Sequence, residues 1–267
     1  MTALGRVQPK DGIIRVAGPS LSSSVVARLE VEEGDPVKTG QVIAVLEQAP
    51  VMRAAVAELE AAVAAKEAAV LGARAERDDV RREESRQDSL SRQGLIPIAE
   101  RERWASRLEV AETSLRHAVL EVETSRAALK RARLDSDRTA VRSPIDGRVL
   151  KLHARAGEKV GDDGIAELGR TGEMYVVAEV YDSDIPAVKV GQRATIRSPL
   201  VPAPLRGVVE RIGGKIGKKD VLGTDPAARV DVRVVEVEIR LDDGTPVRAL
   251  TNLVVDVEIA TVPPPAS

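Results

Sequence analysis

The stretch that decides the fold is VARLEVEEGDPV at residues 26–37, because it returns as VLKLHARAGEKV at residues 149–160. In both copies an apolar strand leads into a turn that contains a glycine, and the turn ends on a valine. A further match joins IAVL at residues 43–46 to IAEL at residues 165–168. Each half is too small to bury its own apolar face. The repeat therefore predicts that the two halves pair into one small two-sheet sandwich.

Residues 50–137, between the two copies, have a different composition, rich in Ala, Glu, Arg, Leu and Val, which favours long helices. The only strong break is at residues 94–97, where a glycine that can end a helix is followed by a proline that cannot continue one. We therefore expect two antiparallel helices of about 40 residues, each about 60 Å long.

Both helical arms carry apolar residues at coiled-coil spacing. In the first arm the spacing is interrupted by Lys66 and Arg77, and the apolar positions are Val56, Leu59, Val63, Val70, Ala73 and Val80. In the second arm the alternation of four and three is unbroken through Trp104, Leu108, Ala111, Leu115, Ala118, Val122, Ser125, Leu129 and Ala132. This spacing predicts a heptad seam between the arms.

After Asp137 a strand-like pattern returns. Val230, Val232 and Val234 alternate with polar residues, and the alternation continues from Val235 in the opposite phase. A phase slip of one residue within a strand predicts a β-bulge. The last residues, 263–267, are expected to form an extended or disordered tail.

Composition excludes several classes of protein. Lys and Arg total 40 against 42 Asp and Glu, for a net charge of −2, which argues against nucleic acid as a partner. The absence of Cys excludes thiolate metal sites, a Cys nucleophile and disulfides. No stretch approaches the roughly 20 apolar residues that cross a bilayer. Aromatic residues are limited to Trp104, Tyr175 and Tyr181, which suits thin modules better than one large core.

Two segments resemble the halves of a biotinyl/lipoyl module: EGDPVKTGQVIAVL at residues 33–46 and VRSPIDGRV at residues 141–149. A module of this kind split by a coiled-coil hairpin is the arrangement of the HlyD-type membrane fusion proteins, the periplasmic adaptors. The flanks are similar to one branch, the DevB-like subunits of ABC exporters, at residues 3–9, 222–228 and 252–257.

The resemblance implies an α+β fold class and an elongated chain. A split lipoyl-like β-sandwich is expected at residues 18–48 and 138–170, with an inserted antiparallel coiled-coil helical hairpin at residues 50–137. A C-terminal β-barrel is expected at residues 4–17 and 171–262. The resemblance does not decide whether these residues also include a membrane-proximal part.

The resemblance also implies a function in transport. The chain is expected to be a non-catalytic efflux adaptor of a tripartite complex, linking an inner-membrane ABC transporter to a TolC-like outer-membrane channel. It is expected to assemble with itself, typically as a hexamer, and to lie in the periplasm. The family usually carries an N-terminal inner-membrane helix, and this sequence shows none. Either Met1 begins a soluble fragment or the protein is anchored differently, and we favour the fragment.

Adaptors that dock on TolC-like channels resemble one another at the hairpin tip, where an Arg is followed by a Leu four residues later and a Ser seven residues after that. Arg86 and Leu90 fit this pattern, whereas Pro97 stands where Ser is expected. The predicted docking residues are therefore Arg86, Leu90, Gly94 and Pro97. The alternative interpretation is that Arg86 is one of several solvated helix arginines.

Three other functions stay open: an adaptor of a proton-driven RND pump, a lipoyl or biotinyl carrier subunit, and an unrelated structural coiled-coil protein with β ends. A carrier needs a Lys in the turn that the hairpin replaces, so we expect no cofactor.

The remaining candidate sites offer little chemistry. His117 and His153 lie in different modules without partners at ligand spacing, so we expect neither a metal site nor a catalytic base. The run from Gly213 to Asp220 departs from a phosphate-binding loop, and we interpret it as a basic loop between strands.

Overall fold

The computed structural model describes residues 1–18, 24–218 and 233–260. The chain divides into two compact units, one formed by Met1–Val45 with Val141–Ser267 and the other by Leu46–Ala140. Three parts of the sequence argument lie outside the described residues: the flank at residues 222–228, the alternation at residues 230–232 and the tail at residues 263–267.

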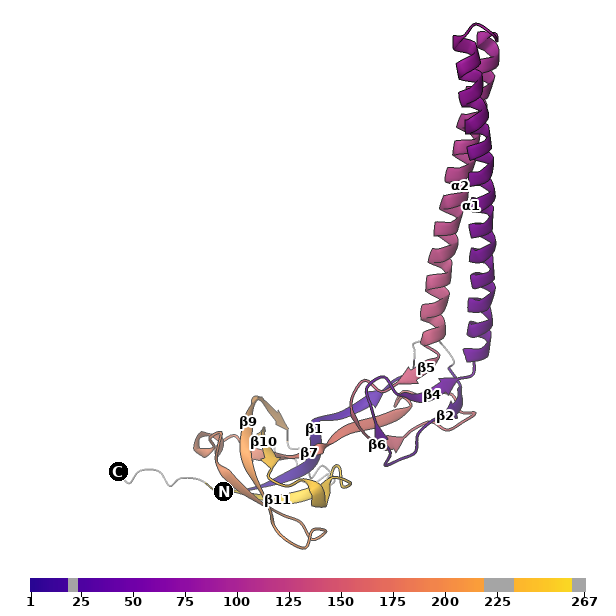
Figure 1. Ribbon diagram of the computed structural model, residues 1–267. Coiled ribbons are helices and arrows are strands. Elements are labelled where there is room, and N and C mark those ends of the chain that lie inside the picture. The colour runs from indigo at the N-terminus through magenta and orange to yellow at the C-terminus, as the bar shows by residue number, and fades with distance from the viewer. Residues whose placement is uncertain (19–23, 219–232, 261–267) are drawn as a thin grey trace. The chain divides into compact units, whose positions relative to one another are not determined.

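The first unit is built from β-strands and the second from two long helices (Figure 1). The helices are α1 (Ala49–Arg92) and α2 (Ile98–Asp137), and neither is apolar enough to cross a membrane. The strands before them are β1 (Thr2–Val16), β2 (Val26–Leu29), β3 (Pro36–Val37) and β4 (Val42–Leu46). The strands after them are β5 (Ala140–Arg142), β6 (Gly147–Leu152), β7 (Ala166–Tyr181), β8 (Arg193–Arg197), β9 (Leu205–Lys218), β10 (Arg233–Leu241) and β11 (Val254–Ile259), with short 3-10 turns at Ile185–Ala187 and Thr245–Val247.

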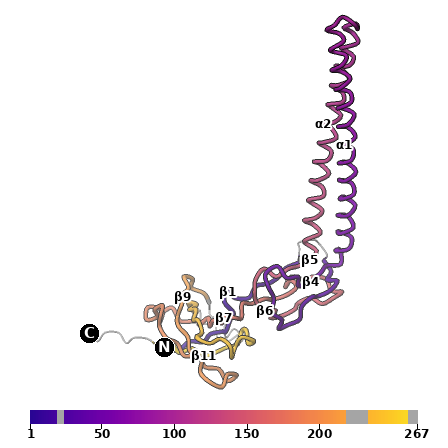
Figure 2. Tube along the Cα trace, in the orientation of Figure 1, coloured from indigo at the N-terminus to yellow at the C-terminus, as the bar shows by residue number. Residues whose placement is uncertain are grey.

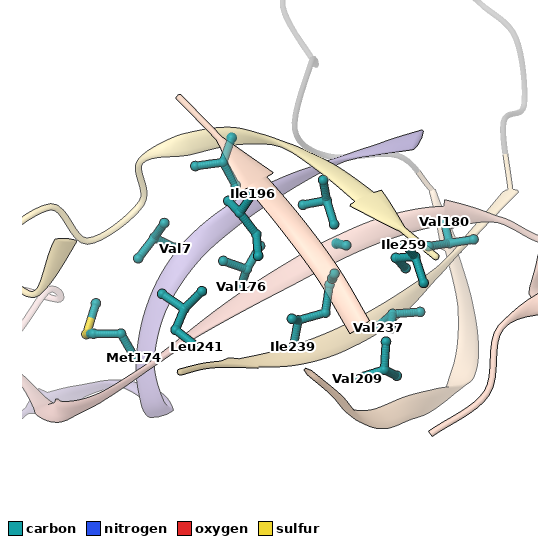
Figure 3. Packing of buried hydrophobic residues seen from close by; sticks show 14 of the residues in the cluster. Val7, Met174, Val176, Val180, Ile196, Val209, Val237, Ile239, Leu241 and Ile259 are labelled. Carbon is teal, nitrogen blue, oxygen red and sulfur yellow. The ribbon is translucent and has the colours of Figure 1, made fainter. Parts of the chain in front are cut away.

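Six strands of the first unit pair in a cycle. The antiparallel order β1-β11-β8-β9-β10-β7 returns to its start, because β7 also pairs with β1. Aliphatic side chains from all six strands meet inside this cycle (Figure 3), and Val7, Val176, Ile196, Val237 and Ile259 are almost completely buried. Their burial follows from the two-residue period of a β-strand, because alternate side chains of a strand point to the same face.

The predicted bulge in β10 is wrong, because the extra residues lie in its neighbour β9. Val235 pairs with Ile216 and Val237 with Ile212, so three residues of β9 stand opposite one residue of β10. Strand β10 pairs with β7 in unbroken register from Val234 to Arg240, and Val234 is buried on the opposite face of the strand from Val237.

Strands β1 and β7 pair along nearly their whole length, from Leu4 opposite Glu179 to Val16 opposite Ala166. The register shifts on both sides of Lys10, at the point where β7 passes Arg170. The predicted domain boundary after residue 170 stays a prediction, because both sides of it belong to the same compact unit. The first part of β1 belongs to the six-strand cycle, and its last residues pair with the part of β7 that also pairs with β6.

The two repeat halves close on each other through reciprocal backbone hydrogen bonds. Val26 donates to Glu158 O (2.9 Å) and accepts from Gly157 N (2.7 Å). In the same way Val149 donates to Asp35 O (2.9 Å) and accepts from Gly34 N (2.8 Å). The strand of each half thus binds the turn of the other half. The sequence repeat reappears as a pseudo-two-fold pattern of bonding.

The side chains of the two turns repeat the same pattern. Asp35 Oδ2 accepts from Glu32 N at 2.8 Å, and Glu158 Oε2 accepts from Arg155 N at 2.9 Å. Each carboxylate stabilises its own turn by accepting a backbone N–H.

Both sheets of this module mix strands from the two halves. The three-stranded sheet has the order β2-β4-β5, and β3 pairs with β6 in the larger sheet. Several matched positions of the repeat are buried, namely Val26, Ile43, Val149, Ile165 and Leu168. The predicted α+β fold, with a split sandwich and an inserted helical hairpin, is confirmed.

The turn glycines provide a test of the module. Gly34 has φ +91°, and an added Cβ would meet no atom within 4 Å, so Gly34→Ala introduces backbone strain without a clash. We expect it to lower the free energy of unfolding by about 1–2 kcal/mol. Chemical denaturation followed by the near-UV circular dichroism of Tyr175 and Tyr181 measures this unit, while fluorescence of Trp104 measures the helical unit.

Gly161→Ala is the matched control, because Gly161 also has open space around it but no positive φ. It should change stability by less than about 1 kcal/mol. Equal effects of the two substitutions would contradict the role given to the Gly34 turn.

Candidate functional site

The helical hairpin carries the candidate site, and its seam follows the predicted spacing. Helices α1 and α2 lie side by side along their length (Figures 1 and 2). Apart from Ala49 at the start of α1, the buried residues of the two helices are Val63, Ala111, Val122 and Leu129, which are all predicted seam positions. The remaining seam positions are half-buried. A two-helix seam this narrow covers one side of each helix and leaves the other side in water.

Ion pairs across the seam fix the register of the hairpin. Lys66, which interrupts the apolar spacing of α1, donates from Nζ to Glu121 Oε2 at 3.0 Å. This hydrogen bond, followed by the charge of Lys66, lowers the pKa of Glu121. Two further pairs join the helices, Arg126 with Glu67 at 2.5 Å and, nearer the start of α1, Arg133 with Glu60 at 2.6 Å. A polar residue in a seam favours one register over others.

The tip of the hairpin is a Schellman turn. Gly94 has φ +74°, which is the left-handed conformation that glycine adopts readily. Gly94 N donates to Ser91 O at 2.9 Å, and Leu95 N donates to Leu90 O at 3.0 Å. These bonds satisfy the last carbonyls of α1 and reverse the chain. Pro97 then caps α2 in an extended conformation, with φ −66° and ψ 147°.

The structure places the four predicted docking residues at or near this tip. Gly94 and Pro97 belong to the turn and contribute to it through their backbone conformations. Leu90 is half-buried on the last turns of α1, and Arg86 lies one turn earlier, exposed and paired with Glu83. Hydrogen bonds from Gln87 and then Arg86 lower the pKa of Glu83, so this carboxylate stays charged beside the arginine. The docking role of these four residues stays a prediction.

Sequence reasoning missed two apolar side chains at the tip. Leu95 lies in the turn with 65% of its surface exposed, and Ile98 begins α2 with 67% exposed. The sequence predicts only a helix break at residues 94–97, because the exposure of a side chain in a turn depends on how the turn directs the chain. The tip thus presents Leu95 and Ile98 to solvent within a rigid turn.

The two histidines differ in their surroundings. His117 is exposed on α2, whereas His153 is mostly buried, with Nε2 3.2 Å from Glu167 Oε1. This carboxylate could not be predicted from spacing, because it comes from the neighbouring strand β7. Among the described residues, no three His, Asp or Glu side chains gather as metal ligands do.

The prediction of a loop is wrong for the described part of the glycine- and lysine-rich run. Residues 213–218 belong to strand β9, where Ile216 lies opposite Val235 of β10. Gly213 lies against the backbone of Glu236, and a Cβ there would approach Glu236 O to 2.9 Å, so close strand pairing explains this glycine. Lys219 and Asp220 lie outside the described residues.

Residues 16–166 match the family described as CzcB-like, barrel-sandwich hybrid domain. The matched region covers the split module together with the inserted hairpin. The chain belongs to the CzcB-like barrel-sandwich hybrid family. The resemblance to membrane fusion proteins is thereby confirmed, and the DevB-like branch stays a prediction.

Solved structures share the fold of this family member over almost its whole length. MacA from Actinobacillus actinomycetemcomitans is 17% identical with a TM-score of 0.79, covering 98% of this chain and 79% of MacA. The membrane fusion protein Spr0693 from Streptococcus pneumoniae R6 is 16% identical with a TM-score of 0.63, covering 98% of this chain and 99% of Spr0693. A MacA–MexA chimera that contains the Pseudomonas aeruginosa MexA α-hairpin domain is 18% identical with a TM-score of 0.60, covering 98% of this chain and 79% of the chimera.

The Lys66–Glu121 pair predicts how the hairpin of this family member responds to acid. Because the pair lowers the pKa of Glu121, its contribution to stability is present above the unfolded pKa of about 4.3 and is lost as pH falls through the lower folded value. We expect Lys66→Met to make hairpin stability less sensitive to pH between about 5 and 3. Denaturant unfolding at several pH values, followed by Trp104 fluorescence, measures this.

Arg74→Met is the matched control, because it also removes a cation from α1 but leaves the pair intact. The control should keep the acid sensitivity of the parent chain. If Lys66→Met keeps it as well, the pair does not stabilise the hairpin.

Proposed function

We propose that the chain is the periplasmic adaptor of a tripartite export machine, linking an inner-membrane ABC transporter to a TolC-like outer-membrane channel. One observation carries this proposal: a rigid helical hairpin with an apolar tip is inserted into a barrel-sandwich module whose two halves bind each other. The family membership and the fold shared with MacA and Spr0693 support it.

The adaptor does no chemistry of its own in this proposal. The partner transporter supplies the energy from ATP. The adaptor aligns transporter and channel, seals the path between them and transmits conformational change. The chain assembles around that path as a ring, a hexamer by the family resemblance. It acts in the periplasm, held at the inner membrane.

The tip is the part that we propose to meet the channel. Leu95 and Ile98 are exposed and held by the Schellman turn, so their burial in an apolar slot requires little ordering of the chain. Full burial of such a side chain contributes about 1.5–3 kcal/mol. Arg86 contributes less, because an exposed cation that already has an anionic partner gains little from a new one.

A binding measurement tests the tip. We expect the double substitution Leu95→Glu and Ile98→Glu to weaken binding to a detergent-solubilised TolC-like channel at least about tenfold, or 1.4 kcal/mol. Arg86→Ala should weaken it by less than about fivefold. Biolayer interferometry with immobilised channel gives both affinities, and far-UV circular dichroism verifies that the helices remain folded.

Val190→Glu is the control, because Val190 is also an exposed aliphatic residue, with 63% of its surface in water, but belongs to the β unit. It should bind the channel as the parent chain does. Binding by the tip variant with parent affinity would reject tip docking. A pull-down from membranes identifies the pump, and capture of a proton-driven RND pump would reject the ABC assignment.

A further inference from the structure

A cavity of about 640 Å³ lies in the β unit, beside a gap in the strand pairing of β7. Strand β6 pairs with β7 only as far as Gly169, and the pairing of β10 with β7 begins at Tyr175. Residues 170–173 therefore have no cross-strand partner in β6 or β10. These residues border the cavity together with the start of β6 and with Arg248.

Strand β1 is irregular at the same level. Residues 171–173 of β7 have no partner in β1 either, because the register shifts on both sides of Lys10. Asp11 and Gly12 are the extra residues of β1, and both have positive φ, +64° and +76°. Extra residues of this kind interrupt the ladder and change the direction of a strand. The cavity is thus built into the backbone of two strands.

Gly172 keeps the cavity open. It lies in the segment without a cross-strand partner, and an added Cβ would meet no atom within 4 Å. Its φ is not positive, so the backbone conformation does not require a glycine. A larger side chain at this position would occupy the cavity without a clash. The glycine therefore preserves space for a ligand, which is one of the uses of glycine in a strand.

The cavity is lined by more cations than anions. The cations are Lys10, Arg148, Arg170 and Arg248, and the carboxylates are Asp146 and Glu173. Lys10 Nζ lies 3.0 Å from Glu173 Oε1, and Arg170 Nη1 lies 2.9 Å from Asp11 Oδ2. Two of the four cations therefore already have an anionic partner.

Arg148 and Arg248 have no carboxylate partner among the described residues. Arg148 donates to Gly34 O, which uses one of the five N–H donors of its guanidinium. Arg248 is exposed, and its side chain makes neither an ion pair nor a hydrogen bond with the described parts of the chain. The planar fork of a guanidinium matches the oxygens of an anion. Two such forks in one cavity favour an anionic ligand.

The hydroxyl of Thr171 adds a neutral donor. Only 8% of Thr171 is exposed, and the residue lines the cavity. Its hydroxyl makes no hydrogen bond within the described ranges of the chain. Because a buried hydroxyl without a partner destabilises the fold, a ligand oxygen that accepts from Thr171 recovers this loss.

We propose that this cavity binds a soluble phosphate ester, whose phosphate is held between Arg148 and Arg248 and accepts a hydrogen bond from Thr171. A phosphate ester has three terminal oxygens, enough to accept from both guanidinium forks. A single carboxylate is satisfied by one fork. The inference goes beyond the proposed function and does not depend on it, since neither a channel nor a transporter takes part.

Asp146 restricts the class of ester. Its Oδ1 accepts from Thr39 N at 2.7 Å, and this hydrogen bond, followed by one from the Thr39 hydroxyl, lowers the pKa of Asp146. A charged carboxylate repels a polyphosphate but accepts hydrogen bonds from hydroxyl groups. The volume of the cavity is in the range of roughly 300–1,000 Å³ that holds small organic ligands. The ligand is therefore a hydroxyl-bearing monophosphate of the glycerol phosphate or sugar phosphate class.

Phosphorus NMR of glycerol 3-phosphate titrated with the full chain tests the site. The buffer is free of phosphate, low in salt and at about pH 8, above the second phosphate pKa of about 6. We expect a dissociation constant on the order of 1 mM, because exposed cations bind weakly in water. Arg248→Gln should weaken binding at least tenfold. Absence of binding to the parent chain would overturn the proposal.

Arg155→Gln is the matched control. Arg155 is also an exposed arginine of the β unit, it has no ion pair with the described residues, and it does not line the cavity. This variant should bind the ester as the parent chain does. Equal weakening by Arg155→Gln and Arg248→Gln would show attraction by net charge alone and overturn the site.

Filling the cavity provides a test that removes no charge. Gly172→Val should weaken binding at least tenfold, because the new side chain takes the space of the ligand. Gly214→Val is its control, since Gly214 also lies in a strand, with open space around it and no positive φ. Near-UV circular dichroism of the tyrosines verifies that both variants are folded. Binding by Gly172→Val at parent affinity would place the ligand outside this cavity.

Two further ligands test the chemical class and its source. Succinate has the charge of the ester at this pH but only carboxylates, and it should compete at least fivefold more weakly. Equal competition would overturn the choice of phosphate. Vesicles of phosphatidylglycerol offer the phosphate of a lipid headgroup, and we expect their cosedimentation with the chain to be independent of Arg248. Cosedimentation that requires Arg248, without binding of glycerol 3-phosphate, would overturn the soluble ligand in favour of a headgroup.

Discussion

Four backbone hydrogen bonds, exchanged between Val26 and the turn at residues 157–158 and between Val149 and the turn at residues 34–35, close the β module across the inserted hairpin. The two halves share their sheets, since β5 completes the sheet of β2 and β4, and β6 supplies the partner of β3. The entropy of bringing the halves together grows only slowly with the length of the chain between them. A long hairpin can therefore be inserted without destabilising the module that holds its ends.

The hairpin, by contrast, buries only a small part of each helix. Its seam is one stripe wide and buries small and medium side chains such as Ala111 and Val122, so most of each helix stays in water. Interhelical ion pairs hold the register that a thin apolar seam specifies only weakly. The same geometry leaves two long outward faces and a tip available to other proteins. The hairpin therefore has a large exposed surface and a small buried interior.

The sequence predicted the parts of the molecule that depend on periodicity. The repeat around residues 26–37 predicted the closed module, and the four-three spacing in α2 predicted the seam. The sequence did not predict the features that depend on tertiary contacts. The run at residues 213–218 looks like a loop because of its glycines, but it belongs to strand β9, where Gly213 lies close to the backbone of β10. The contact of His153 with Glu167 joins the residue after β6 to strand β7, and the exposure of Leu95 and Ile98 depends on how the Schellman turn directs the chain.

The long pairing of strands β1 and β7 determines how the β unit responds to mechanical force. Both run from the six-strand cycle into the split module without leaving the sheet, and they are hydrogen-bonded to each other on both sides of the irregularity at Lys10. A tensile load along these strands is shared by many hydrogen bonds in shear, and failure requires them to break together. A load perpendicular to the strands opens the same bonds one after another. The β unit therefore resists stretching along β1 and β7 far more than peeling across them.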